Sequence, residues 1–120
     1  NDQEIVFMNT HIDHHLDNAE SISNVRQIRA SANSYDGKPI IISGDFNKTP
    51  ESRMIKKMEL DFINAASTIS QPVLTYRSTN PKTQIDYVFT SKDWKIQSIE
   101  IPYSLASDHL PLVAEISLES

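Results

Sequence analysis

The sequence predicts an α/β fold in which a mixed, mainly antiparallel sheet carries two helices on one face. Three observations support this prediction. Short runs rich in Ile and Val alternate with segments of helical periodicity, polar loops follow the apolar runs, and 120 residues suit a single hydrophobic core. Because the chain contains no internal repeat, low-complexity segment or linker, we expect one continuous domain or part of one.

The first third of the chain predicts a strand, a loop and a helix. Glu4–Asn9 is a short apolar run suited to a buried strand, and the polar segment Thr10–Asp17 contains three of the four histidines. From Asn18 onward, apolar residues recur at intervals of three and four, as on one face of an amphipathic helix. Asp17 or Asn18 can cap this helix, and Gly37 closes it.

The rest of the chain predicts four more strands and a short helix. Pro39–Ser43 is a β-branched run without alternation, which is typical of a strand buried on both faces. Glu51–Leu60 predicts a short helix, and the irregular stretch that follows it is assigned little structure. Three consecutive strands, which we expect to pair as neighbours, complete the pattern: Ile85–Thr90, Trp94–Pro102 and Leu112–Leu118.

Composition excludes some functional classes. A net charge of −5 and a pI near 5.2 argue against a protein that binds a phosphate backbone through bulk electrostatics. Without cysteine there is neither a disulfide framework nor a thiolate zinc site, and the compartment stays undetermined. No apolar run is long enough to span a bilayer. We expect a soluble protein, and the first residues, which lack an initiator Met, leave export with removal of a signal segment open.

Acidic residues and histidines collect in the loops at the predicted strand ends, where α/β folds bind ligands. Asp and Asn oxygens suit a hard cation such as Mg²⁺ or Mn²⁺, and histidines beside an anion supply protons or charge. Together these groups can position a water molecule, accept or donate a proton and stabilise the oxygens of a phosphate ester. The candidates are His11, Asp45, Asn47, Asp86, Asp108 and His109.

The segment from Gly44 to Asn47 is the most specific of these sequence patterns. It follows directly after the β-branched run Ile40–Ile42, and glycine lets the backbone turn sharply there. Asp45 and Asn47 can therefore face one pocket. The simpler interpretation is that both side chains only form a turn, since both residue types bond their own backbone.

Four blocks together resemble the endonuclease/exonuclease/phosphatase superfamily, which has the deoxyribonuclease I-like fold. Each block alone is a weak signal, but their order and spacing make the resemblance specific, and it extends from Ile5 to Ile116. It implies half of a four-layer α/β sandwich and a metal-dependent phosphoester hydrolase that uses water as the nucleophile. The blocks are NTHIDHH at Asn9–His15, SGDFNKTP at Ser43–Pro50, IDYVFTS at Ile85–Ser91 and SDHLPLVAEI at Ser107–Ile116.

The resemblance also implies a role for each candidate in the first two blocks. Asp45 would orient or deprotonate the attacking water, or protonate the leaving group. Asn47 would hold a phosphate oxygen, and His11 would face the phosphate from the other side.

The last two blocks would supply a metal ligand and a proton donor. Asp108 would bind Mg²⁺ or Mn²⁺ directly or through water. His109 would donate to the phosphate, while Asp86 would hold its imidazole in the required tautomer.

The resemblance covers only the carboxyl-terminal half of the family's domain, to which residues 1–120 would correspond. The amino-terminal half would supply a second sheet and a Glu that is the main metal ligand, and no residue of this chain replaces that Glu. We therefore expect weak or absent turnover from this chain alone. We also expect an apolar sheet face that binds the missing half or causes self-association.

Several alternatives remain open at this point. Family substrates range over nucleic acids, nucleotides, inositol phosphates and phospholipid headgroups such as sphingomyelin. A second hypothesis is a non-catalytic module that binds a divalent metal or a protein. A third is a transition-metal site formed by His11, Asp13, His14 and His15, although His14 and His15 can equally be ordinary loop residues.

Overall fold

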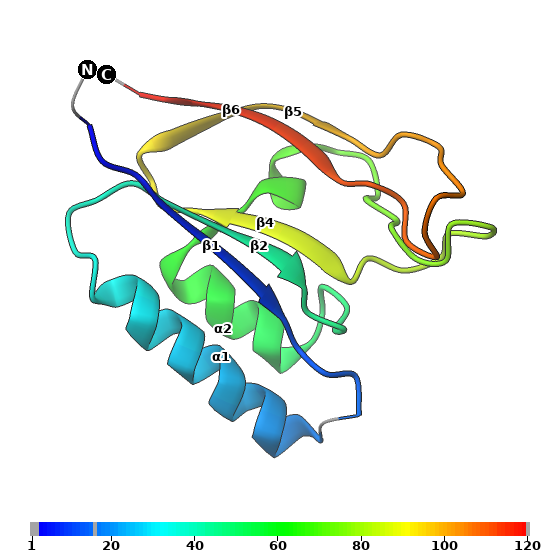
Figure 1. Cartoon of the computed structure of the whole chain (residues 1–120), viewed down its shortest axis with the longest axis horizontal. Coiled ribbons are helices and arrows are strands. Elements are labelled where there is room, and N and C mark those ends of the chain that lie inside the picture. Colours follow the sequence, from blue (N-terminus) through cyan, green and yellow to red (C-terminus); the bar gives the residue numbers. More distant parts are fainter. Residues whose placement is uncertain (1–2, 16, 120) are drawn as a thin grey trace.

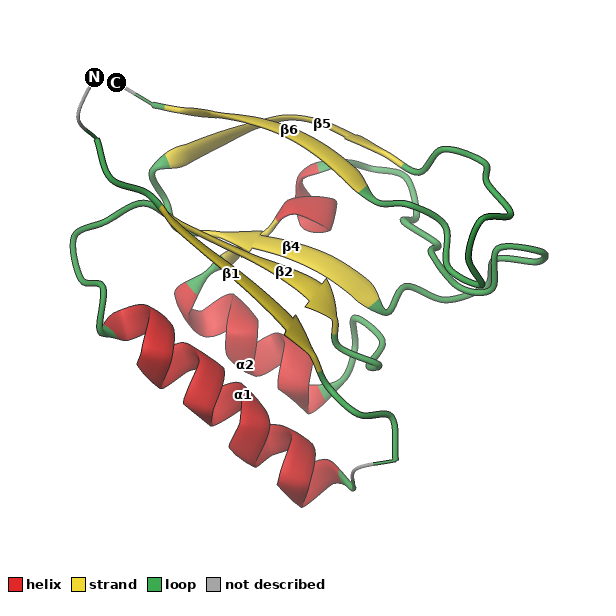
Figure 2. Ribbon diagram, in the orientation of Figure 1, coloured by secondary structure: helices red, strands yellow, loops and turns green. Residues whose placement is uncertain are grey.

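The computed structural model describes residues 3–15 and 17–119 and confirms the α/β class. The elements follow in the order β1 (Val6–His11), α1 (Asn18–Asn33), β2 (Ile40–Asp45), α2 (Arg53–Asp61), β3 (Ile63–Asn64), the 3-10 helix η1 (Ala65–Thr68), β4 (Asp86–Thr90), β5 (Trp94–Glu100) and β6 (Val113–Leu118). A four-stranded mixed sheet has the order β1-β2-β4-β3, and β5 pairs with β6 in a second sheet. Both long helices cover one face of the larger sheet (Figures 1 and 2).

The unit β1-α1-β2 forms the first side of the sheet. The two strands are parallel, with Val6 opposite Ile40 and His11 opposite Asp45. Helix α1 connects them, and the Asp17 side chain caps its first turn by accepting the Glu20 N–H at 2.8 Å. Asp17 is thus one of the two caps that the sequence predicts. Both strands extend two residues beyond their predicted ends, so the last residue of each carries a candidate side chain.

The hydrophobic core lies between the four-stranded sheet and the two helices. Ile42 on β2 and Phe89 on β4 are opposite each other and fully buried, and Val25 from α1 and Met58 from α2 are buried in the same cluster. Phe46 packs edge-on against the Phe89 ring, with ring centroids 5.3 Å apart. Close packing of this kind fixes the positions of the strand ends, on which the candidate side chains stand.

The predicted pairing of the last three strands is wrong in one respect. β4 does not pair with β5; it pairs with β2 on one edge and with β3 on the other. The reason is burial, because β4 carries Tyr87 and Phe89, both almost inaccessible to solvent, and these side chains need a central place in the core. β5 and β6 pair with each other as predicted, and they run antiparallel.

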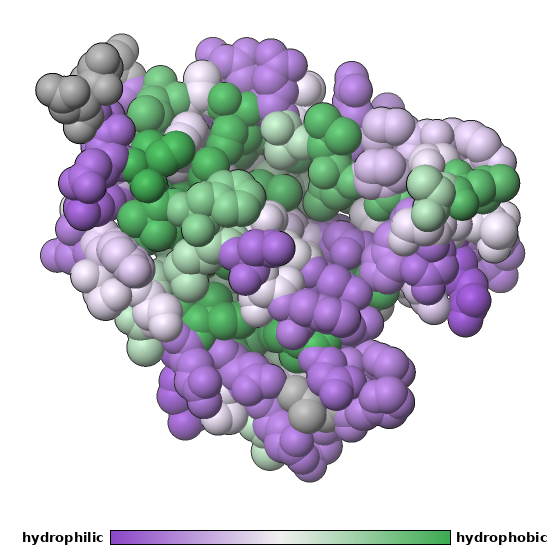
Figure 3. All heavy atoms as spheres, in the orientation of Figure 1, coloured by the Kyte–Doolittle hydropathy of each residue, from purple (hydrophilic) through white to green (hydrophobic). Residues whose placement is uncertain are grey.

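The second sheet lies on the side of the larger sheet that faces away from the helices (Figure 1). Phe7, on this open face, is 64 % exposed, while Ile41 beside it is half-buried. Val113 and Leu118 on β6 are exposed as well. Figure 3 shows hydrophobic atoms gathered over the start of β1 and the neighbouring part of β5 and β6. An apolar surface therefore remains uncovered here, as the sequence predicts.

The stretch between α2 and β4 has more structure than the sequence predicts. It begins with β3 and η1, and later Tyr76 forms isolated bridges to Thr83 and to His109. Thr75 is fully buried, and its hydroxyl accepts the Ile85 N–H at 3.3 Å. Within the described residues, no helix is both long and apolar enough to cross a membrane.

Candidate active site

Three strands bring one candidate side chain each into a single row. His11 ends β1 and lies opposite Asp45, which ends β2. Asp45 in turn lies opposite Asp86, which begins β4. Since β1 and β2 are parallel while β4 runs the other way, two strand ends and one strand start meet at the same edge. Residues directly opposite each other share a face of the sheet, so all three side chains stand on the open face.

His109 completes the row from the loop before β6. Its Nδ1 lies 2.7 Å from Oδ2 of Asp86, and its Nε2 lies 3.6 Å from Oδ2 of Asp45. The three side chains are only 19 to 24 % exposed. Nε2 of His11 also lies 3.6 Å from Oδ2 of Asp45, but its ring is largely exposed. The Asp45 carboxylate thus lies between two imidazoles, one half-buried and one open to solvent.

The charges of this group shift the pKa values of two members. Burial, the largest single influence, lowers the pKa of His109, but the hydrogen bond and charge of Asp86, together with the charges of Asp45 and Asp108, raise that pKa overall. Burial raises the pKa of Asp45, and the nearby Asp86 raises it further, although the Asn47 N–H and the two histidines oppose this. His109 is therefore a better cation, and Asp45 a better base, than in free solution.

The turn after β2 depends on Gly44. Its φ of +150° is one that other residues rarely adopt, and a Cβ at this position would overlap the carbonyl oxygen of Thr10 on β1. Asn47 has a φ of +51°. Its N–H donates to Oδ1 of Asp45 at 2.8 Å, and its side-chain amide donates to the Ile12 carbonyl at 2.6 Å. The turn thus fixes the Asp45 carboxylate, and Asn47 keeps a second amide hydrogen for a ligand.

Asp108 stands at the edge of the group. Its side chain is exposed, and its Oδ1 lies 4.0 Å from Nε2 of His109. Ligand atoms of Asp45, Asp86 and His109 lie within 4.8 Å of one another and could hold a metal ion. One oxygen of Asp86 is already paired with His109. Besides Asp86, the carboxylates of Asp45 and Asp108 lie 3.6 and 4.0 Å from Nε2 of His109 and are further candidate ligands.

A segment that sequence reasoning left out holds the His109 loop in place. Ser78 N–H donates to the Asp108 carbonyl at 2.8 Å, and the Leu110 N–H donates to the Thr75 carbonyl at 2.7 Å. Between these bonds the Tyr76 ring packs against the His109 imidazole, with centroids 5.0 Å apart and planes inclined by 60°. The apolar and β-branched residues VLTY at 73–76 could have indicated a buried segment here, but they are isolated in a polar stretch.

The surface beside the row is hollowed. A pocket of about 280 Å³ is lined by Asp45 and Asp86 together with Val88, Leu110 and Leu112. Its lining therefore combines two carboxylates with apolar side chains. A ligand with a charged or polar head and a less polar remainder would match this lining.

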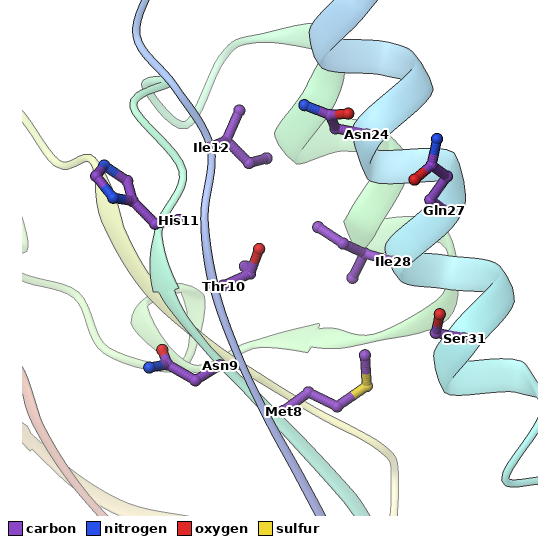
Figure 4. Close-up of a pocket in the computed structure, with 9 residues that line it drawn as sticks. All are labelled: Met8, Asn9, Thr10, His11, Ile12, Asn24, Gln27, Ile28 and Ser31. Carbon is purple, nitrogen blue, oxygen red and sulfur yellow. The ribbon is translucent and has the colours of Figure 1, made fainter.

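A second pocket, of about 310 Å³, lies between β1 and α1 (Figure 4). Met8, Thr10 and Ile12 point from the strand toward the helix, whereas Asn9 and His11 point to the opposite side (Figure 4). This alternation along β1 separates the pocket from the row of candidate side chains. Although His11 borders the pocket, its imidazole belongs to the row with Asp45.

Comparison with known proteins gives one family. The sequence profile of the Endonuclease/Exonuclease/phosphatase family matches residues 4–109. No curated protein matches the chain. A solved endonuclease/exonuclease/phosphatase from Bacteroides vulgatus has 24 % identity and a TM-score of 0.81, and the match covers 94 % of this chain and 50 % of that one.

Two further structures share the fold. The mannosyl-6-phosphatase of Bacteroides thetaiotaomicron has 16 % identity and a TM-score of 0.76, with 93 % of this chain and 51 % of that one covered. The human Nocturnin catalytic domain has 21 % identity and a TM-score of 0.69, with 95 % and 47 % covered. The chain thus spans about half the length of these proteins. From the profile match over most of its length, the chain belongs to the endonuclease/exonuclease/phosphatase family.

Proposed function

We propose that this protein is a metal-dependent phosphoester hydrolase that uses water as the nucleophile. The observation that carries the proposal is the row itself, in which a half-buried imidazole is paired with Asp86 at 2.7 Å and turns its other nitrogen toward Asp45. Membership of the family supports it, and one structure with the same fold is a mannosyl-6-phosphatase.

His109 acts as a proton donor to a phosphate oxygen. An ionised Asp86 can only accept a hydrogen bond, so Nδ1 of His109 carries a proton and points it at that carboxylate. The raised pKa of His109 favours a second proton on Nε2, the nitrogen that faces the open side of the row. A protonated Nε2 stabilises the charge that develops on the phosphoryl oxygens in the transition state.

Asp45 accepts or donates the other proton that moves during hydrolysis. Its carboxylate lies between Nε2 of His11 and Nε2 of His109, 3.6 Å from each. As water attacks phosphorus and the ester P–O bond breaks, one proton leaves the water and one reaches the departing oxygen. Asp45 takes the first of these or supplies the second, and Asn47 holds a phosphate oxygen with its remaining amide hydrogen.

The carboxylates present have the donor chemistry for a hard divalent cation. Asp45 and Asp108 flank Nε2 of His109 at 3.6 and 4.0 Å, and carboxylate oxygens are preferred ligands of Mg²⁺ and Mn²⁺. When bound, such an ion would polarise the phosphoryl oxygens and offset their charge. Two carboxylates cannot fill an octahedral shell, so water, the substrate and residues outside this chain would supply the other ligands.

The complete site needs more than these 120 residues. We propose that they are the carboxyl-terminal half of the domain and that the other half contributes a Glu ligand and covers the apolar surface around Phe7. The half coverage of the similar structures supports this. Turnover by this chain alone should accordingly be weak. The acidic charge disfavours long duplex DNA as the substrate and leaves nucleotides, sugar or inositol phosphates and phospholipid headgroups.

Hydrolysis of bis-p-nitrophenyl phosphate with Mg²⁺ or Mn²⁺ tests the proposal. We expect a parent protein that includes the amino-terminal half to be active and its His109→Ala variant to lose roughly 10²- to 10⁴-fold. Asp36→Asn, on the exposed turn after α1, is the control and should retain full activity. Full activity of His109→Ala would refute the proposal, and equal turnover by the 120-residue chain would refute the need for a second half.

A non-catalytic module is the second candidate, and the uncovered apolar surface favours it. Phe7 on the open face of the four-stranded sheet is exposed, and so are Val113 and Leu118 at the two ends of β6. If a folded parent shows no turnover with any phosphoester, yet this chain binds its other half or Mg²⁺, the binding function stands and the hydrolase does not.

A further inference from the structure

The loop between β1 and α1 contains a second cluster of metal-ligating side chains. Oδ1 of Asp13 lies 3.0 Å from Nδ1 of His15 and 3.8 Å from Nδ1 of His14. The two imidazole rings are 3.8 Å apart and inclined by 41°. Ligand atoms of all three residues lie within 4.8 Å of one another. Two ring nitrogens therefore converge on one carboxylate oxygen.

The spacing of these atoms is close to that of a small tetrahedral site. Zinc–nitrogen and zinc–oxygen bonds of about 2.0–2.2 Å place tetrahedral ligands about 3.3–3.6 Å from one another. The observed separations lie on both sides of this range. The side chains are 58 to 76 % exposed, so small rotations about their side-chain bonds can close the difference without disturbing the core.

Hydrogen bonds anchor the strand that precedes these donors and the helix that follows them. Ile12, almost fully buried, donates its N–H to the Asp45 carbonyl at 2.9 Å, and Asp17 caps α1. Within the loop, the His15 N–H donates to Oδ1 of Asp13 at 2.9 Å. This bond restricts Asp13 and His15 before an ion binds, which lowers the entropy cost of binding.

The donor set differs in kind from that of the candidate active site. Two imidazole nitrogens and one carboxylate suit zinc, nickel or copper, whereas Mg²⁺ prefers oxygen ligands and near-octahedral geometry. His11, which the sequence grouped with this loop, belongs elsewhere because its Nε2 faces Asp45. The structure therefore reduces the four-residue hypothesis to three residues.

We propose that Asp13, His14 and His15 bind one late first-row transition cation of the zinc class, with water completing its coordination. The site is separate from the row of Asp45, Asp86 and His109. The proposal does not rest on the proposed hydrolase activity. Occupancy of this zinc-class site should not change the position of His109, and the hydrolase should still need a hard cation.

Calorimetric titration of the 120-residue chain with Zn²⁺ tests the site. We expect one saturable equivalent that a large excess of Mg²⁺ does not displace. His14→Ala and His15→Ala should each weaken binding at least tenfold, since loss of even an outer partner of a metal ligand costs about 10- to 100-fold. The matched control is the double variant Asp45→Asn/Asp108→Asn, which should bind Zn²⁺ as the wild type does.

Two outcomes would overturn the proposal. One is the absence of saturable Zn²⁺ binding by the wild type. The other is binding that survives in the double variant His14→Ala/His15→Ala but disappears in Asp45→Asn/Asp108→Asn. Because His14 and His15 are exposed, their replacement should leave the far-ultraviolet circular dichroism spectrum unchanged, which separates loss of a ligand from loss of the fold.

Discussion

Replacing Asp86 by Asn tests whether this residue acts through His109. The variant keeps the shape of the side chain but removes the charge that lies 2.7 Å from Nδ1 of the imidazole. An Asn side chain can also present its NH₂ group to Nδ1, which would select the other tautomer. Both effects disfavour the doubly protonated imidazolium of His109, on which its role as a proton donor depends.

The size of the effect follows from the geometry of this pair. A separation of 2.7 Å is typical of a charge-assisted hydrogen bond, and such bonds contribute about 1.5–3 kcal/mol. If the whole of this energy is lost from the transition state, kcat/KM falls by roughly 10- to 150-fold, at about 1.4 kcal/mol for each factor of ten. Both side chains retain about a fifth of their exposure, so we exclude the upper limit of this range and expect a loss of about 10- to 100-fold.

Activity and nuclear magnetic resonance together provide the assay. kcat/KM on bis-p-nitrophenyl phosphate should fall by this factor in Asp86→Asn of the parent protein. The double variant Asp86→Asn/His109→Ala should lose no more than His109→Ala alone, because Asp86 then has no imidazole to position. In the wild type the His109 ring should titrate above the ordinary histidine pKa, and its midpoint should fall in Asp86→Asn. Additive losses, or an unchanged midpoint, would refute the reasoning.

Three further predictions concern stability, each measured by urea unfolding of the 120-residue chain. Gly44→Ala should lower the free energy of unfolding by more than about 1 kcal/mol, because its φ is +150° and its Cβ would overlap the Thr10 carbonyl; equal stability would contradict this geometry. Tyr87→Phe should cost about 1–2 kcal/mol, because the buried hydroxyl donates to the Lys48 carbonyl at 2.7 Å, and a neutral result would mean that water replaces this bond. The folded pKa of His109 is raised, so its protonated ring stabilises the folded state. This stabilisation is complete below the unfolded pKa of about 6.5 and is lost as the pH rises through the folded pKa. The corresponding decrease in the free energy of unfolding should vanish in His109→Ala.

The sequence predicted the parts of the fold that depend on local pattern. The interval of apolar residues identifies α1, and the side chain of Asp17 caps it because a carboxylate at this position accepts an N–H of the first turn. The row at the sheet edge was predictable for a similar reason. Parallel strands end together, so residues that follow two apolar runs, such as His11 and Asp45, meet there.

The missing parts depend on contacts between distant segments. The residues of β4 and β5 do not indicate that β4 lies between β2 and β3. The burial of Phe89 determines this position, and that burial depends on how the helices cover the sheet. Likewise Tyr76 contacts His109 although more than thirty residues separate them in sequence. A polar stretch without periodicity gave no sign of that contact.

The division of the chain into two sheets also gives its assembly an order in time. Every strand of the four-stranded sheet and both helices are complete at Thr90, whereas His109 follows 19 residues later. At synthesis rates of about 5–20 residues per second, this interval lasts about 1–4 s. During it the sheet can already form, with Asp45 and Asp86 side by side and no imidazole near them. The two carboxylates repel each other until His109 arrives and offsets part of their negative charge. A segment made late in synthesis therefore stabilises two acidic residues of the sheet that forms first.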